Sequence, residues 1–231
     1  MKSQITIRKI QDLLIKGVQT IRVDDDTSRR MWWASLEVIQ KEFLAKNYQQ
    51  GGIWVASPLP ALNDKKFFNQ LQGWLWSPEG FPYFQKENSG FLPINQSAKI
   101  KKDFDFVSNY KVLNLSQNDG YEPFLMIITP NFQCILSIAG DKDKKILLMK
   151  CDEDSLKITI ELMHEKLNQE NREEGVKFRN AINNLGNLNI NNQFEKFFWP
   201  ILSAKLAKFA PNHNIQNSAK NDKQNVQITE A

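Results

Sequence analysis

The chain has 231 residues, the length of one domain with or without a tail. Hydrophobic residues make up 41% of it, including 15 Phe and 6 Trp, so it can form a sizeable core and is not a disordered protein. The net charge is only +4 and basic residues are interleaved with acidic ones, which argues against nucleic acid as a partner.

The cysteine and histidine content argues against two classes of domain, those stabilised by disulfides and those that bind a metal. Two Cys and two His without clustered spacing predict neither a disulfide framework nor a metal site, and no motif suggests a cofactor. The N-terminal segment Met1–Gly17 is charged throughout and lacks the apolar run of a signal peptide. The longest apolar region, Phe124–Ala139, is interrupted by Pro130 and Asn131, so we expect no membrane span and a cytoplasmic location.

The first third of the chain alternates helix and strand patterns. Apolar residues at helical spacing predict helices, and alternation of apolar with polar residues predicts strands. In chain order the predicted elements are a helix ending at Gly17, a strand at Val18–Val23, a helix at Ser28–Lys46, a strand at Ile53–Ala56, a short helix at Asn63–Leu71 and a strand at Trp74–Trp76. This β-α-β-α-β order favours parallel strands joined by right-handed crossovers.

A long irregular stretch, Ser77–Phe106, follows these elements and is punctuated by proline and glycine. Loops of this length are uncommon in compact domains and are often binding loops or insertions. The stretch contains several aromatic residues, so we expect part of it to pack on the domain. Tyr110–Leu115 then predicts a further strand.

The segment Glu122–Cys151 has the pattern of a three-stranded antiparallel meander. Its apolar runs are Phe124–Thr129, Phe132–Ala139 and Lys145–Cys151, and tight turns separate them. We expect this meander to form the centre of a sheet.

The C-terminal part is predicted to be helical. Helices are expected at Leu156–Asn168, at Glu170–Leu185 and at Asn192–Phe209, the last with Pro200 inside it. The fold class is therefore mixed α/β (α+β): one mixed sheet with a central antiparallel meander, flanked by helices. We expect a domain over residues 1–210 and a disordered tail or linker over residues 211–231, which lack aromatic side chains.

The acidic run Asp24–Asp26 is one candidate for chemistry. In response-regulator receivers, acids at a strand end hold Mg²⁺ beside a phospho-accepting Asp on a later strand. Here the later strand ends at Ser57, which has no carboxylate. A small metal-dependent enzyme using Asp24–Asp26 is therefore our least favoured alternative, and an acidic N-terminus of the following helix is the preferred interpretation.

His164 precedes Glu165 on a predicted helix, as the phospho-accepting His of a histidine kinase precedes an acid. The next residues are Lys166, Leu167 and Asn168, which do not continue that motif, and no ATP-lid pattern follows. We expect His164 to be a solvent-facing helix residue and predict no catalytic residue in this chain.

Aromatic residues near the long irregular stretch form a candidate ligand-binding set. They are Trp54, Trp74, Trp76, Phe81 and Tyr83, with Phe84 beside them. Such residues can line a small-molecule pocket, but core packing and anchoring of the loop are the preferred explanation.

Cys134 and Cys151 lie on neighbouring strands of the predicted meander. A hairpin turning near Lys142 places them within one residue of direct opposition. They are a candidate redox pair, and the alternative is two buried small apolar residues. The helix Phe194–Phe209 has a similar ambiguity, because it suits a membrane surface, the domain itself or a second copy of the chain.

Four stretches occur together in a recognisable order. They are RRMWWASLEV at Arg29–Val38, GGIWVASPLP at Gly51–Pro60, PFLMIITP at Pro123–Pro130 followed by Phe132, and FFWP at Phe197–Pro200. In this order they resemble the N-terminal sensory region of certain cyanobacterial sensor histidine kinases, over about residues 10–210. The strand pair around Ile127–Ile138 also resembles the DICT sensory domain of cyanobacterial signalling proteins.

This resemblance implies a sensory or regulatory input domain of two-component signal transduction. In that family a dimerisation helix and an ATP-binding domain follow, and neither motif occurs in this sequence, so no kinase activity is implied for any residue here. The partners implied are a kinase, a response regulator, a small-molecule ligand or a second copy of the chain. The alternative is a stand-alone protein-interaction module that senses nothing.

Overall fold

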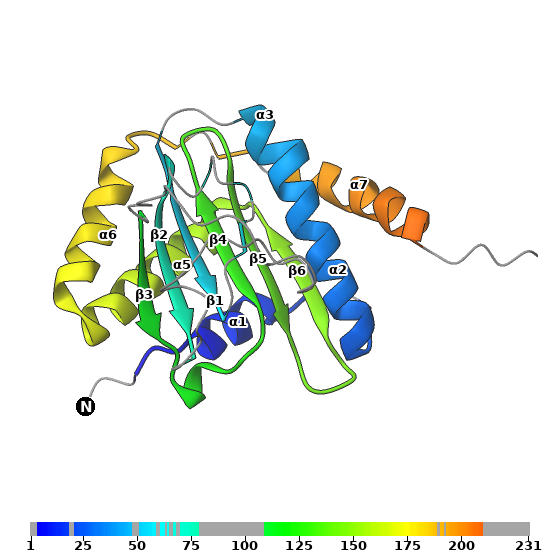
Figure 1. Ribbon diagram of the computed structural model, residues 1–231, viewed down its shortest axis with the longest axis horizontal. Coiled ribbons are helices and arrows are strands. Elements are labelled where there is room, and N and C mark those ends of the chain that lie inside the picture. Colours follow the sequence, from blue (N-terminus) through cyan, green and yellow to red (C-terminus); the bar gives the residue numbers. More distant parts are fainter. Residues whose placement is uncertain are drawn as a thin grey trace, which may run out of the picture.

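The computed structural model describes residues 4–18, 21–47, 51–58, 61–62, 64, 67, 70–78, 109–188, 190–191 and 193–209. These residues form one six-stranded mixed sheet with helices on both faces (Figure 1). The strands are β1 (Ile53–Ser57), β2 (Gln72–Ser77), β3 (Tyr110–Asn114), β4 (Phe124–Ile128), β5 (Gln133–Ala139) and β6 (Ile146–Lys150). The helices are α1 (Ile7–Ile15), α2 (Asp25–Val38), α3 (Ala45–Asn47), α5 (Glu153–Glu170), α6 (Arg172–Asn184) and α7 (Gln193–Phe209). The predicted mixed α/β class is confirmed.

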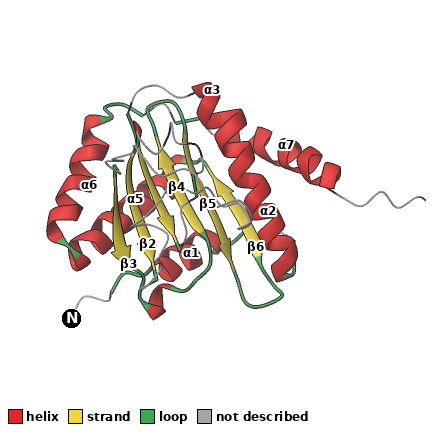
Figure 2. Cartoon of the chain, viewed as in Figure 1, coloured by secondary structure: helices red, strands yellow, loops and turns green. Residues whose placement is uncertain are grey.

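The strands lie in the order β3-β2-β1-β4-β5-β6. β1 and β2 run parallel, as the alternation of strand and helix patterns predicts, and β3 pairs with β2 in parallel as well. β4, β5 and β6 form the predicted antiparallel meander, and Figure 2 shows all six strands side by side in one sheet. The meander is one half of the sheet and not its centre, because β1 pairs with β4 while β6 forms an edge.

The predicted strand at Val18–Val23 is absent from the part of this segment that the structure describes. Only Val23 pairs, in an isolated bridge with Lys145, and Ile21 is 82% exposed. A strand requires a partner along its length, and among the described residues of this segment only Val23 meets the sheet. Alternation of apolar and polar residues therefore gave the wrong prediction here.

Side chains alternate along the strands and divide the core into two layers. On one face, Trp54 of β1 belongs to a core cluster that also includes residues of α2 and α7. On the other face, Val55 of β1 and Trp74 and Trp76 of β2 pack under α1, α5 and α6. We call these the α2 face and the α5 face. Every residue of β1, β4 and β5 is buried, as expected for strands covered on both sides.

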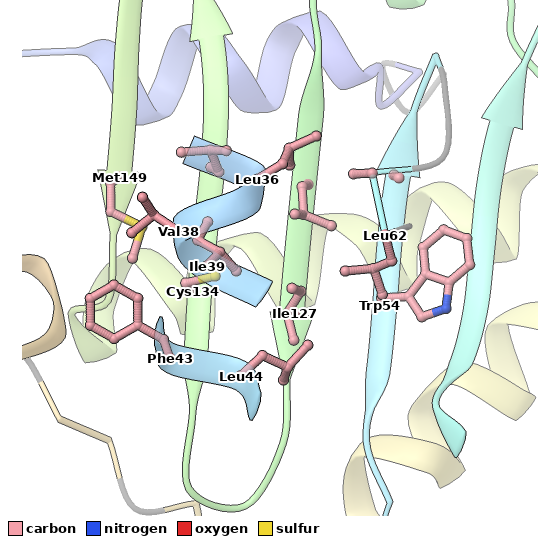
Figure 3. Packing of buried hydrophobic residues seen from close by; sticks show 14 of the residues in the cluster. Leu36, Val38, Ile39, Phe43, Leu44, Trp54, Leu62, Ile127, Cys134 and Met149 are labelled. Atoms are coloured by element: carbon pink, nitrogen blue, oxygen red, sulfur yellow. The ribbon is translucent and has the colours of Figure 1, made fainter. Parts of the chain in front are cut away.

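The helix predicted at Ser28–Lys46 starts earlier and changes type in its second half. It begins as α2 and continues through a π-helical segment, Ile39–Leu44, into α3. Within the π-helical segment, the side-chain amide of Gln40 donates to the Leu36 carbonyl at 3.2 Å, and its oxygen accepts from the Asp64 amide at 3.2 Å. Figure 3 shows the apolar side chains of this region directed at the sheet: Val38, Ile39, Phe43 and Leu44 beside Ile127, Cys134 and Met149.

The three C-terminal helices are confirmed as α5, α6 and α7, each within a few residues of its predicted bounds. The predicted loop Ser77–Phe106 falls almost entirely outside the described residues, as does the tail 211–231, and most of Asn63–Leu71 does too. None of the helices that the structure describes is long and apolar enough to cross a bilayer.

Candidate functional site

The contact between α7 and the rest of the domain is the candidate functional site. α7 packs against α2 at the β6 side of the sheet, and its last turns extend away from the sheet (Figure 1). Of its side chains that the structure describes, only Phe198 and Leu202 are fully buried. Both belong to the core cluster of the α2 face.

A three-ring aromatic cluster holds the first turn of α7. Phe194 meets Phe132 edge to face at 5.1 Å between ring centroids, and it meets Phe43 in the same way at 5.6 Å. Phe43 and Phe132 stack on each other at 5.8 Å. Each such ring pair contributes about 0.5–1.5 kcal/mol beyond the area that it buries. The cluster therefore joins α7 to the π-helical segment and to the turn between β4 and β5.

Pro200 lies between the two buried residues of α7. Proline has no amide hydrogen, so the helical hydrogen bond to the Lys196 carbonyl is missing at this point. Before Pro200, Phe198 packs edge to face on Trp199 at 5.0 Å between centroids. After Pro200, Leu202 is the remaining buried anchor. The helix is therefore held at two places with a weakened backbone between them.

A salt bridge and a groove complete the contact between α2 and α7. Lys205 Nζ lies 2.6 Å from a Glu37 carboxylate oxygen, and Lys41 Nζ lies 2.8 Å from the other. Hydrogen bonds from Lys205 and then Lys41 lower the pKa of Glu37. Beside this pair runs a groove of about 390 Å³, with Val38 and Ile201 among its lining residues. The groove is lined by these apolar residues together with lysine and glutamate side chains of α2, the π-helical segment and α7.

A buried ionic network lies on the opposite, α5 face. Lys166 is fully buried, and its Nζ lies 2.7 Å from Asp119 Oδ1 and 2.6 Å from Glu170 Oε1. The same Asp119 oxygen accepts from the Ile7 amide at 2.9 Å, where α1 begins. Trp76 Nε1 donates to Glu170 Oε2 at 2.7 Å, and Lys166 lies 5.3 Å from the centre of the Trp76 ring. The network therefore ties α1, α5 and β2 together.

The charge of Asp119 is kept by its partners. Burial favours the neutral acid, but hydrogen bonds from Lys166, the Ile7 amide and Ser116 outweigh burial and lower the pKa of Asp119. Next to this network, Trp74 Nε1 donates to Glu174 Oε2 at 3.0 Å. These contacts hold α5 and α6 on the sheet, and they leave α7 unattached to this face.

The structure separates the predicted ligand-binding tryptophans. Trp54 lies on the α2 face, whereas Trp74 and Trp76 lie on the α5 face, and all three are fully buried. The sheet itself stands between them, so they do not line one pocket. Phe81 and Tyr83, with Phe84, lie outside the described residues.

Cys134 and Cys151 are brought together on the α2 face. Both are free thiols, and both are buried in the core cluster that includes Phe198 and Leu202. Burial raises the pKa of each thiol well above its usual range, and a nearby Glu195 carboxylate adds to the effect at Cys151. In the observed state both sulfurs are therefore protonated and shielded.

The other candidate groups take structural positions. Asp24 caps α2: its carboxylate accepts from the Thr27 amide at 2.7 Å and from the Thr27 hydroxyl at 2.9 Å. Nowhere in the described ranges do three His, Cys, Asp or Glu side chains gather as metal ligands do. His164 is partly buried between α5 and α6 and contacts Arg179 and Asn168, so it is less exposed than predicted.

Comparison with known proteins places the chain in a family. A model of a domain of unknown function, DUF8628, matches residues 8–211, which span the whole sheet and every helix of the domain from α2 to α7. No curated protein and no solved structure matches the chain. The chain belongs to the DUF8628 family.

Proposed function

We propose that the chain is a regulatory input module of two-component signal transduction. In this proposal the sheet domain receives a signal, and α7 carries the signal to a kinase or response regulator. The observation that carries the proposal is the attachment of α7 through two buried side chains, one aromatic cluster and one partly exposed salt bridge.

The energy of this attachment suits a two-state element. Burial of a Phe or Leu side chain stabilises by about 1.5–3 kcal/mol. If α7 leaves the domain as an intact helix, exposure of the two buried anchors costs about 3–6 kcal/mol. A ligand or partner can supply a free energy of this size to shift a conformational equilibrium.

The sequence resemblance supports the choice of partner. The stretches at Arg29–Val38 and Phe197–Pro200, which carry the resemblance to sensory regions of sensor histidine kinases, are α2 and the part of α7 that packs near it. Two of the four resembling stretches therefore lie at the proposed transmitting contact, and the other two contain β1 and β4. Ligand binding by the sheet domain, with a small molecule or a protein as the signal, is the input side of the same proposal.

A stand-alone protein-interaction module is the second candidate. The observation in its favour is Phe197, which is 57% exposed on α7 beside the buried Phe198. An exposed phenylalanine on a helix face is suited to direct contact with a partner. In this alternative α7 stays docked and serves as a fixed binding surface.

Binding to defined partners separates the two candidates. Purified histidine kinase regions and receiver domains from the organism that encodes the chain are immobilised, and the Kd of the chain is measured by biolayer interferometry. An input module predicts binding to at least one of them, and a change in Kd of roughly tenfold or more for Phe198→Ala, because this variant shifts the docking equilibrium. Phe197→Ala, the matched control, should change Kd much less.

The opposite ranking supports the interaction module. If Phe197→Ala weakens binding and Phe198→Ala leaves it unchanged, then α7 acts as a fixed surface. Absence of binding to every kinase and receiver domain would contradict the two-component proposal.

A further inference from the structure

The two cysteines are placed for a bond to each other. The pairing of β5 with β6 ends at Ile135 opposite Lys150, and continuation of this register by one residue opposes Cys134 and Cys151. Opposed residues in an antiparallel pair have Cα atoms about 4.5 or 5.5 Å apart. Both separations lie within the range of about 4.4–6.8 Å that a disulfide spans.

α7 helps to cover this pair. Cys134 is 0% exposed and Cys151 is 1% exposed, in the same cluster as Phe198 and Leu202. Glu195, in the first turn of α7, lies close enough for its charge to act on the Cys151 thiol. In Figure 3 Cys134 lies close to Ile39 and Phe43, and the ring of Phe43 meets Phe194 of α7. Removal of α7 would therefore open the layer beside Cys151, while Cys134 stays next to Ile39 of the π-helical segment.

We propose that Cys134 and Cys151 are a redox-sensitive thiol pair whose oxidation is controlled by the docking of α7. This inference rests on the proposed function, because it requires α7 to be the element that moves. With α7 docked, the pair is shielded from oxidants. With α7 undocked, Cys151 becomes accessible and Cys134 remains beside it on the neighbouring strand.

The chemistry requires a peroxide as the oxidant. The Cys151 sulfur attacks one oxygen of hydrogen peroxide, the O–O bond breaks, and a sulfenic acid and one water are formed. The Cys134 sulfur then attacks the sulfenic sulfur, the S–O bond breaks, and a second water leaves as the disulfide forms. The two thiols lose two hydrogens in total, and the peroxide is reduced to water.

Thiol reactivity in variants of α7 tests the inference. The rate of reaction with a chromogenic aromatic disulfide is measured for the native chain, for Phe198→Ala and for Lys205→Glu, with Phe197→Ala as the matched control. We expect Phe198→Ala to react roughly tenfold faster or more, because the large-to-small change removes a buried anchor of α7. Lys205→Glu should react roughly threefold faster or more, because it places a second acid beside Glu37. Lys205 is partly exposed, so its variant keeps the test valid if Phe198→Ala does not fold.

Hydrogen peroxide treatment then identifies the product. Intact-mass spectrometry should show a loss of two hydrogens per chain, faster in both variants than in the control, and Cys134→Ser should abolish this loss. In parallel, hydrogen exchange of α7 amides reports whether the helix has opened. Faster α7 exchange without faster thiol reaction, or oxidation without an internal disulfide, would overturn the inference and leave the proposed function intact. Unchanged α7 exchange in both variants would contradict the proposed function itself.

Discussion

Lys166 is the residue on which the α5 face depends most. A fully buried ammonium group is costly unless its charge is matched, and here two carboxylates and one aromatic ring surround it. Asp119 also accepts a hydrogen bond from the Ile7 amide, so it orients the start of α1 as well. A buried charge pair of this kind adds little folding stability compared with apolar residues of similar volume, but removal of one partner is strongly destabilising.

Replacement of Lys166 by Met should therefore destabilise the domain strongly. The buried Asp119 and the partly buried Glu170 would lose their shared cation, and removal of one partner from a buried charge pair costs about 3–5 kcal/mol. Chemical denaturation measures the change in the free energy of unfolding. Lys157→Met is the matched control on the same helix, because Lys157 forms an exposed pair with Glu153, and it should leave the midpoint nearly unchanged. Equal effects of the two variants would contradict the assigned role of Lys166.

Asp119 also predicts a pH dependence of stability. Its pKa is lower in the folded protein than the usual value near 3.8, so the unfolded chain binds a proton more readily. The stabilisation is therefore complete above the unfolded-state pKa and is lost as the pH falls below about 5 toward the folded-state pKa. The free energy of unfolding of Asp119→Asn should fall less steeply than that of the native chain in this acidic range. Parallel pH profiles for the two proteins would contradict this prediction.

At the scale of elements, the parallel pair β1 and β2 depends on a glycine. Gly73 lies opposite Trp54, and a Cβ at this position would overlap the six-membered ring and the ring nitrogen of the Trp54 indole. The indole therefore lies directly over the Gly73 backbone, and it also meets the Tyr110 ring at 5.6 Å between centroids. A methyl group at Gly73 would force the indole to move within a packed core.

Gly73→Ala should lower stability by about 1–3 kcal/mol, the usual cost of overpacking a core. Thermal denaturation measures the shift in Tm. The double variant Gly73→Ala with Trp54→Phe tests the cause, because the smaller ring leaves room for the added methyl group. We expect the double variant to lose less stability than the two single variants lose together. A loss equal to or larger than that sum would show that steric overlap between these residues is not the cause.

At the scale of the whole molecule, local sequence patterns predict most helices and strands, but they do not predict contacts between segments that are far apart in the sequence. The meander is predictable because its apolar runs end at turn residues such as Pro130 and Gly140. The π-helical segment is not, because its apolar side chains continue the periodicity of α2. Val18–Val23 alternates like a strand, yet of its described residues only Val23 pairs, with Lys145 next to the edge strand β6.

The candidate site was partly visible in the sequence. The apolar helix ending at Phe209, with Pro200 inside it, is predicted correctly, but its partners Phe43 and Phe132 come from distant segments. In the ionic network, Glu170 is four residues from Lys166 and can be anticipated, whereas Asp119 is 47 residues away and cannot. Which face of the sheet each tryptophan occupies likewise depends on the register of β1 against β2, which no local pattern determines.

In the proposed function, α7 opens while the sheet stays folded. Native-state hydrogen exchange, followed by mass spectrometry at increasing denaturant concentration, measures the opening free energy of each segment. We predict that α7 amides exchange through a local opening of lower free energy and weak denaturant dependence, while β4 and β5 exchange only through global unfolding. Phe198→Ala should lower the opening free energy of α7, and Phe197→Ala should not. Exchange of α7 and the sheet with one common free energy at every denaturant concentration would contradict the claim.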